Sequence, residues 1–202
     1  MGIESEREGE NDMRCLNPLA RCLADSDPGA PRELVERHHA ELYRYARALL
    51  RDAPAAEEAV QEAFVRAFAA LGTYPKKRIE ALSLRPWLYR ITLIVVRNTW
   101  RDSRREVSVA EKSEETDERF EAVSGLASGA DREACLDALE ALGRLSERQR
   151  VAVALRYLEG LPYAEIAEVT DWPENTCKTL VRRGIGRLGA LLSDESNGKG
   201  GS

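Results

Sequence analysis

The sequence has few aromatic residues and no long apolar segment. Phe, Trp and Tyr together make up only 6% of the chain, so a core must be built mainly from aliphatic side chains. No apolar run approaches the length that a bilayer-spanning helix needs, which predicts a protein without membrane insertion. The first residues are acidic and polar, unlike a secretory signal, and both Met1 and Met13 are candidate start residues. We therefore expect a cytoplasmic protein.

Residues able to carry chemistry are also scarce and scattered. The four cysteines are Cys15, Cys22, Cys135 and Cys177. Their spacing matches neither a Cys-x-x-Cys zinc pattern nor a disulfide framework, so we expect reduced thiols, with a redox role left open. The adjacent His38 and His39 would point to different sides of a helix, and no Gly-rich phosphate loop or Ser–His–acid set can be assembled. The sequence predicts no cofactor, no metal site and no catalytic residue, hence a protein that is not an enzyme.

What the chain does contain is a large share of good helix formers. Hydrophobic residues make up 43% of it, and Ala, Leu, Glu and Arg are abundant, which favours an all-α fold. The net charge is −5, and an acidic total weighs weakly against nucleic-acid binding. The charges are segregated, however, because residues 85–105 are rich in arginine while the charged residues of 106–133 are mostly acidic. A basic segment of this kind can attract phosphate locally.

Hydrophobic periodicity and breaker residues divide the chain into two small helical domains joined by a flexible acidic linker. We expect a flexible arm over residues 1–30, a first domain over 31–105, the linker over 106–131, a second domain over 132–192 and a disordered tail over 193–202. The expected helices of the first domain span 33–50, a segment ending near 71, and 84–105; those of the second span 132–143, 147–159, 163–169 and 174–192.

The break at residues 170–173 separates a short helix from a longer basic one, which is the layout of a helix-turn-helix. At helical spacing, the longer helix has an apolar face and an opposite polar face that carries Asn175, Lys178, Thr179, Arg182 and Arg183. Side chains of these types can bond to base edges and phosphates in the DNA major groove. A plain helical hairpin with a charged outer face is the alternative. Gly184 and Gly186 predict a late kink or early fraying of this helix.

The helix expected over 84–105 carries a narrow basic row beside Trp100, formed by Arg90, Arg97, Arg101 and Arg104. We call these four residues the arginine row. Its expected buried side is mostly apolar and carries Leu84, Trp87, Ile91, Ile94, Asn98 and Asp102. Cations beside an aromatic side chain suit a phosphate backbone with stacked, unpaired bases. The alternative is a solvated arginine face with Trp100 packed into the core.

A third constellation is acidic. Glu57, Glu58, Gln61 and Glu62 share one face of the helix that ends near residue 71. This face cannot favour DNA. It predicts either plain solvation or a protein partner with a basic or amide-rich surface.

Three segments together resemble the extracytoplasmic-function sigma factors, the small two-domain promoter-specificity subunits of bacterial RNA polymerase. They are AEEAVQEAFVRAF (56–68), SLRPWLYRITLIVVRNTWRDSRR (83–105) and LSERQRVAVALRYLEGLPYAEIAEVTDWPENTCKTLVRRGIGRL (145–188). In the family's order, they are similar to its polymerase-clamp-binding helix, its −10 promoter-opening regions and its −35-reading region. The resemblance implies a region 2 helical bundle followed by a region 4 helix-turn-helix.

The resemblance also implies partners and sites. The partners would be the polymerase core (the clamp of its largest subunits and the flap), double- and single-stranded promoter DNA, and an anti-sigma factor. Polymerase contacts would come from Glu58, Gln61 and Glu62. The −35 contacts would come from Glu174, Asn175, Thr176, Lys178, Thr179, Arg182 and Arg183. Contacts to the −10 element and the melted strand would come from Lys76, Lys77, Arg78, Ser83, Arg90, Arg97, Asn98, Trp100, Arg101 and Arg104.

The chain departs from the family pattern at positions that bear on promoter choice. Leu93-Ile94-Val95 stands where the family often has an Asn, and Leu180 and Ile185 stand where it usually has arginines, so the resemblance implies an altered promoter preference. Two other functions remain open: a stand-alone helix-turn-helix regulator that binds DNA as a dimer, and a helical adaptor without DNA binding. The regulator explains residues 145–192 but not the arginine row beside Trp100.

Overall fold

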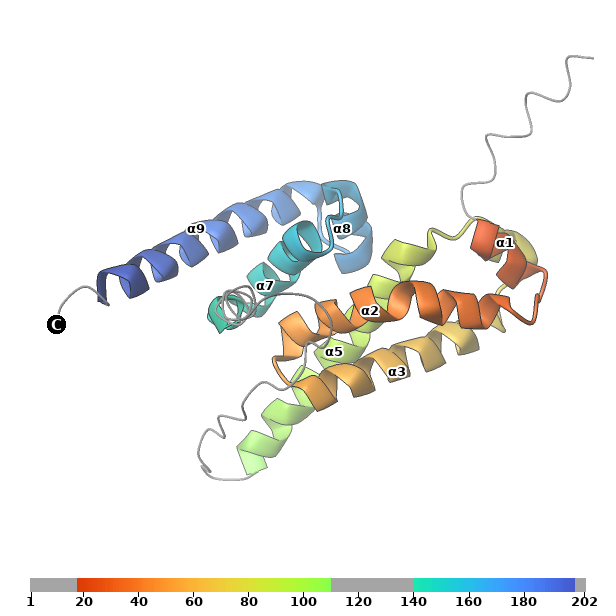
Figure 1. Ribbon diagram of the computed structural model, residues 1–202, viewed down its shortest axis with the longest axis horizontal. Coiled ribbons are helices and arrows are strands. Elements are labelled where there is room, and N and C mark those ends of the chain that lie inside the picture. Colours follow the sequence, from red (N-terminus) through yellow and green to blue (C-terminus); the bar gives the residue numbers. More distant parts are fainter. Residues whose placement is uncertain (1–17, 110–139, 199–202) are drawn as a thin grey trace, which may run out of the picture.

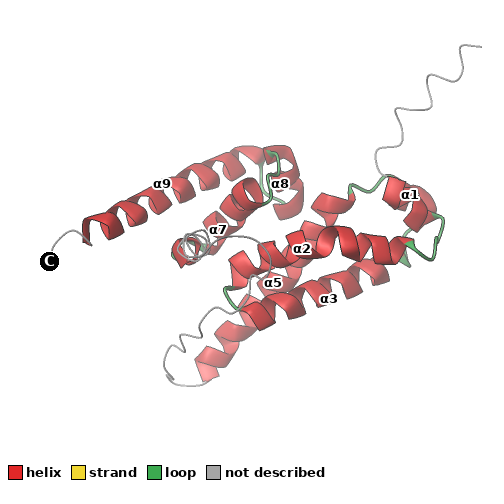
Figure 2. Cartoon of the chain, viewed as in Figure 1, coloured by secondary structure: helices red, strands yellow, loops and turns green. Residues whose placement is uncertain are grey.

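The computed structural model describes residues 18–109 and 140–198 (Figure 1). All regular secondary structure in these two ranges is helical, which confirms the all-α prediction (Figure 2). None of the helices in these ranges is both long and apolar enough to cross a membrane.

The first bundle contains α1 (Pro18–Ala24), α2 (Ala30–Leu50), α3 (Ala53–Leu71), α4 (Lys76–Glu80) and α5 (Leu84–Val109). Helix α2 ends at Leu50 and is capped by Arg51, whose φ is 65° and whose N–H bonds to the Arg47 carbonyl at 3.0 Å. Asp52 then starts α3 by accepting a hydrogen bond from the Ala55 N–H at 2.6 Å. This tight reversal lays α3 alongside α2 (Figure 1).

Helix α5 packs against both α2 and α3 and supplies much of the core of the first bundle. Its buried residues include Leu84, Leu88, Tyr89, Thr92, Leu93, Val95 and Val96. The expected buried side is only partly confirmed: Leu84 is buried and Trp87 and Ile91 pack half-buried against the core, whereas Ile94 is 44% exposed. A helix with neighbours on several sides buries a wide arc, so the centre of that arc depends on the neighbours rather than on periodicity alone.

The second bundle contains α7 (Glu147–Val153), the π-helical turn η2 (Ala154–Leu158), α8 (Tyr163–Thr170) and α9 (Glu174–Gly198). Ser146 and Gln149 cap the start of α7 reciprocally. The α7–η2 segment ends before Gly160, whose φ of 68° is a left-handed conformation that glycine adopts without strain.

Helix α9 packs against both α7 and α8. Its contact with α7 is close at Gly184, where an added Cβ would lie 2.6 Å from Val153 Cγ2. The helix continues through Gly184 and Gly186 to Gly198, so the expected early fraying is wrong. Gly184 serves close packing, and that packing offsets its weak intrinsic helix preference.

Several expected boundaries differ from the observed ones. The flexible arm is wrong for Pro18–Ala24, which forms α1, and α4 lies in a segment expected to be a loop. The disordered tail is wrong for residues 193–198, because α9 ends at Gly198. Helices of one or two turns have too little periodicity to be recognised and are stabilised by tertiary packing. Residues 1–17 of the arm and 110–131 of the linker, and most of the helix expected over 132–143, lie outside the described residues.

The two bundles pack directly against each other. Helix α5 contacts α8, while α2 contacts both η2 and α7. This arrangement brings α5, the helix that carries the arginine row, next to α8 of the helix-turn-helix (Figure 1).

Candidate nucleic-acid interface

Helix α9 presents the polar face that its sequence predicts. Cys177 and Val181 are buried in the second bundle, so the opposite side of the helix is left in solvent. The predicted reading residues are exposed at Glu174, Asn175, Lys178, Arg182 and Arg183, and partly exposed at Thr176 and Thr179. Lys178 forms an ion pair with Glu174 at 2.6 Å. The guanidinium groups of Arg182 and Arg183 are therefore placed where they can reach phosphates or base edges.

The turn before α9 is held by the end of α8. Asp171 has a φ of 58°, and its N–H bonds to the Ala167 carbonyl at 2.9 Å. The Thr170 hydroxyl donates to the Ile166 carbonyl at 2.7 Å and lies 3.9 Å from the Cys177 sulfur. Burial raises the pKa of the Cys177 thiol, so the thiol packs as a neutral group between the two helices. These contacts give α8 and α9 the geometry of a helix-turn-helix.

The arginine row is exposed, as expected, but it faces the second bundle. Arg90 donates to the Asp171 carboxylate at 2.5 Å and to the Glu168 carbonyl at 3.2 Å. The Arg97 guanidinium lies 5.7 Å from the centre of the Trp172 ring, and Arg104 pairs with Glu147. Arg101 bonds instead to Asn98 on its own helix at 3.1 Å. Three of the four arginines thus contact the helix-turn-helix bundle.

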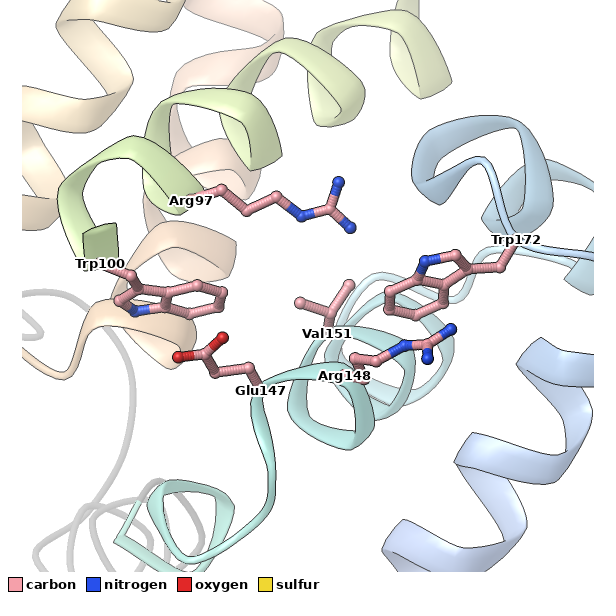
Figure 3. A pocket seen from close by; sticks show the side chains of 6 residues that line it. All are labelled: Arg97, Trp100, Glu147, Arg148, Val151 and Trp172. Carbon is pink, nitrogen blue, oxygen red and sulfur yellow. The ribbon is translucent and has the colours of Figure 1, made fainter. Parts of the chain in front are cut away.

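A pocket of about 170 Å³ lies between the bundles beside the arginine row. It is lined by Arg97, Trp100, Glu147, Arg148, Val151 and Trp172. In Figure 3, Arg97 and Arg148 point toward Trp172 from two sides, and the Arg148 guanidinium is 4.7 Å from the centre of that ring. Trp100 is half-buried and lies near Glu147 at the other end of the pocket (Figure 3). Two indole rings and two guanidinium groups are gathered here, one of each from either bundle.

The basic cluster Lys76–Arg78 lies on α4, which packs beside α1. Lys76 pairs with Asp25 just after α1, and this hydrogen bond raises the pKa of Lys76. The Arg78 guanidinium lies 3.8 Å from the centre of the Tyr74 ring. Ser83 is exposed immediately before α5. The residues predicted to contact the −10 element therefore form two groups, one at α4 and its flanks and one along α5.

The acidic face of α3 leaves Glu58, Gln61 and Glu62 in solvent. Glu62 pairs with Arg66 at 2.7 Å. Val65 lies at helical spacing from Gln61 and Glu62 and is 63% exposed. An apolar side chain inside a charged face can supply the water-excluded centre of a protein contact. The sequence analysis missed Val65, although its spacing from the predicted polymerase contacts is a signal that could have identified it.

A buried contact between the bundles centres on Glu159, which the sequence analysis did not single out. Its side chain is 0% exposed and accepts two bonds from Arg44 of α2, at 2.8 and 3.1 Å. The Tyr89 hydroxyl donates to the same carboxylate at 2.6 Å, and Arg85 donates to the Glu159 carbonyl at 2.6 Å. Burial would lower the pKa of Arg44, but its bonds to Glu159 outweigh burial and raise that pKa above its usual value.

Arg150 forms a second tie between the bundles. Its guanidinium donates to the carbonyls of Leu142, Gly143 and Leu145 in its own bundle, and to Leu49 near the end of α2 at 2.8 Å. The last carbonyls of a helix have no partner within the helix, and a cation is favoured beside them. No local motif could have identified these ties, because Glu159 and Arg150 lie 115 and 101 residues from their partners in the first bundle.

The cysteines and histidines have structural roles where the structure describes them. Cys22 is half-buried and Cys177 is buried, both as free thiols, while Cys15 and Cys135 lie outside the described residues. His38 bonds to Glu41 at 2.5 Å, and His39 bonds to Glu57 at 3.3 Å. Over residues 18–109 and 140–198, no three His, Cys, Asp or Glu side chains are placed to hold a metal ion.

Comparison with known proteins gives matches to both bundles. The family model described as Sigma-70 region 2 matches residues 34–106, and the model described as Sigma-70, region 4 matches residues 135–188. The ECF RNA polymerase sigma factor BldN of Streptomyces coelicolor is 30% identical over 193 residues, covering 87% of this chain and 71% of that protein. The ECF RNA polymerase sigma factor SigK of a Mycobacterium species (strain KMS) is 30% identical over 181 residues, covering 84% of this chain and 86% of that protein.

Solved structures show a similar arrangement of helices. The sigma factor RpoE from Bartonella quintana, in complex with the anti-sigma factor NepR, has a TM-score of 0.64 and 25% identity, covering 80% of this chain and 98% of that one. CnrH, in complex with the cytosolic domain of CnrY, has a TM-score of 0.65 over 87% of this chain and 96% of that one. At 24% identity, the likeness to CnrH shows the fold alone.

Proposed function

Because the chain belongs to the extracytoplasmic-function (ECF) sigma factors, we propose that it binds the core of bacterial RNA polymerase, directs it to specific promoters and helps to melt the DNA there. The observation that carries this proposal is that two separate cationic surfaces lie on two helical bundles of one chain. The α9 face has the layout of a duplex reader, and the arginine row with Trp100 has the layout of a strand binder. Of the domains expected over 31–105 and 132–192, the first is extended by α1 and by the end of α5 to residues 18–109, and the second is extended by α9 to Gly198, so residues 106–109 belong to α5 and not to the expected linker.

Each surface has a distinct role in this proposal. The α9 face, Glu174 to Arg183, contacts the −35 element through base edges and phosphates. The arginine row and the α4 cluster hold the −10 element and the displaced strand, whose unpaired bases stack on aromatic rings. The acidic face of α3, together with the exposed Val65 beside it, docks on the polymerase clamp. The sigma factor itself carries out no covalent chemistry and works in the cytoplasm with the polymerase, and an anti-sigma factor opposes it.

Neither rival function is favoured. A dimeric regulator or an adaptor gives no account of a first bundle that matches sigma region 2 over residues 34–106. The two matches together, in this order along the chain, support a sigma factor.

The first test is co-purification with core polymerase followed by transcription from a candidate promoter. In the double variant Arg97→Ala with Arg101→Ala, we expect promoter opening to fall far more than polymerase binding, because both side chains lie in the arginine row and not on α3. Arg32→Ala is a matched control, since Arg32 is an exposed cation that pairs with Glu36 on α2. Equal loss of opening and of polymerase binding in the double variant would refute the assignment of the arginine row.

The second test addresses polymerase docking. Val65→Asp should weaken the binding of core polymerase, because it places a charge at the centre of a contact that excludes water. Ala40→Asp, at an exposed position of α2, introduces the same charge as a control. If both variants bind core polymerase as tightly as the wild type, α3 is not the docking helix.

The third test addresses duplex recognition by α9. Arg183→Ala should weaken binding to the upstream promoter element and reduce the slope of log affinity against log salt by about 1, as expected for one lost phosphate contact. An unchanged slope, measured in the polymerase complex between low and moderate salt, would place Arg183 away from the DNA backbone.

A further inference from the structure

The pocket between the bundles has a cationic end that no acid of the described residues neutralises. Arg97 of α5 and Arg148 of α7 both lie over the Trp172 ring, at 5.7 and 4.7 Å from its centre. Among the residues that the structure describes, neither guanidinium group forms an ion pair with a carboxylate. Two cations gathered around one ring favour an anion at this end of the pocket.

Other arginines that cross between the bundles have acidic partners. Arg44 pairs with Glu159 at 2.8 Å, and Arg90 pairs with Asp171 at 2.5 Å. The charges of these arginines are balanced within the chain. The two pocket arginines differ, so the uncompensated positive charge of this interface is found beside a cavity.

The opposite end of the pocket is acidic. Glu147 lies there near Trp100, and the buried Val151 lines the space between the two ends (Figure 3). Arg104 occupies one oxygen of the Glu147 carboxylate, and its other oxygen can still accept hydrogen bonds. A matching ligand therefore has an anionic group at one end, a flat apolar body, and a hydrogen-bond donor at the other end.

The volume of the pocket limits the size of that flat body. The pocket encloses about 170 Å³, which is close to the roughly 150 Å³ of a cavity that holds a single benzene ring. One aromatic ring fits, and bases stack favourably on aromatic side chains such as the two indoles here. The Arg97 and Arg148 side chains are exposed, so an anionic group bound to them can extend into solvent. Guanidinium groups bind phosphate well because two N–H groups can bond to it at once.

We infer that this pocket binds a free nucleoside monophosphate whose base is a single ring with an amino group, as in cytosine. The phosphate lies against Arg97 and Arg148, the base stacks on the indoles, and the amino group donates to Glu147. Glutamate accepts from the cytosine amino group in the same way in protein–DNA contacts. Because the two arginines belong to different bundles, ligand binding and bundle packing stabilise each other. This inference goes beyond the proposed function, since it requires neither polymerase nor promoter.

Isothermal titration calorimetry of the full chain, without polymerase, tests the site with cytidine monophosphate (CMP) and matched probes. We expect saturable binding of CMP. Uridine monophosphate (UMP) carries a carbonyl in place of the amino group, and cytidine lacks the phosphate, so each should bind about tenfold more weakly or less. Absence of saturable CMP binding at millimolar concentration, or equal binding of CMP and UMP, would overturn the inference.

Variants test the contribution of each bundle. Arg97→Gln and Arg148→Gln each remove one pocket cation and should weaken CMP binding about tenfold. Arg187→Gln is the matched control, because Arg187 is an exposed cation of α9 that does not line the pocket. Glu147→Gln should reduce the preference for CMP over UMP, since an amide can donate to the UMP carbonyl as well as accept from an amino group. If Arg97→Gln binds CMP as tightly as the wild type, the ligand does not bridge the bundles.

A cytosine in a DNA strand offers the same chemistry, so a labelled oligodeoxycytidylate is titrated in parallel. Arg148 is not among the residues proposed to hold the strand. Arg148→Gln should therefore weaken CMP binding and leave strand binding unchanged. An equal loss of both would mean that the pocket serves the strand and not a free nucleotide. Transcription from a candidate promoter at saturating core polymerase tests the sigma-factor function separately, because CMP binding is measured on the free chain.

Discussion

Gly184 and Gly186 lie two residues apart on α9, and alanine should stabilise the chain at Gly186 but not at Gly184. Gly184 faces α7, where an added Cβ would lie 2.6 Å from Val153 Cγ2 and 3.6 Å from Gln149 Cβ. At Gly186, an added Cβ would find no atom within 4 Å. Because Val153 is β-branched and buried, its methyl group cannot simply rotate away.

The expected magnitude follows from two opposing effects. Replacing glycine by alanine within a helix contributes about 1 kcal/mol of stability at either position. Carbon atoms pack at about 3.5–4.0 Å, so Gly184→Ala forces α9 and α7 apart by about 1 Å, and such overpacking typically costs about 1–3 kcal/mol. Since the gain in helix preference is common to both variants, the difference between their free energies of unfolding should be about 1–3 kcal/mol and should report overpacking alone.

Thermal and urea unfolding of the full chain, followed by circular dichroism, would measure this difference. For a chain of this size, each kcal/mol shifts the midpoint of thermal unfolding by about 2–4 °C. Gly186→Ala should be more stable than the wild type, and Gly184→Ala should be less stable than Gly186→Ala. If the two variants are equally stabilised, α9 does not approach α7 at Gly184 and the packing of the helix-turn-helix bundle is wrong.

Three further predictions concern thiol reactivity, pH and the tie at Arg150. Iodoacetamide should modify Cys177 far more slowly in the native chain than in denaturant, because burial raises the pKa of its thiol; equal rates would contradict its packing. Burial alone would raise the pKa of Glu41, but bonds from His38 and Arg85 lower it below its usual 4.5. The ionised carboxylate therefore stabilises the fold above pH 4.5, and this contribution is lost as the pH falls through the lowered folded-state pKa. Glu41→Gln should reduce the fall of the urea unfolding midpoint below pH 4.5. An unchanged fall would show that the Glu41 carboxylate does not cause it. Arg150→Lys should lower the free energy of unfolding by about 1–3 kcal/mol, since an ammonium group cannot reach all the carbonyls that the Arg150 guanidinium binds. Urea unfolding would measure this loss. A loss well below that range would mean that water replaces the missing hydrogen bonds.

The face of α9 was predictable because its two neighbours, α7 and α8, cover one side only. Periodicity alone then separates buried residues such as Cys177 and Val181 from exposed ones such as Arg182 and Arg183. The same reasoning was only partly right for α5, which has neighbours in both bundles. Ile94 was expected inside and is exposed, whereas Leu93 was not among the expected buried residues and is fully buried.

Sequence patterns also did not predict the short helices or the single buried charge. Helices α1 and α4 are too short to show a repeat, and each is stabilised by packing against the other. In the sequence, Glu159 is an acidic residue before a glycine, and no motif marks it as important. Its importance depends on Arg44, which lies 115 residues away in the sequence and is brought near only by the packing of the bundles.

The sequence by itself determined the helical class, the helix-turn-helix and the alignment of the arginine row, since each depends on residues within a few turns of one another. The tertiary structure decided what those arginines face. The helical repeat places Arg90, Arg97 and Arg104 on one side of α5, but only the packing of the second bundle brings Asp171, Trp172 and Glu147 to them. Local periodicity carries no information about which distant surface will cover a helix, because that choice depends on complementary shape and charge across the whole chain.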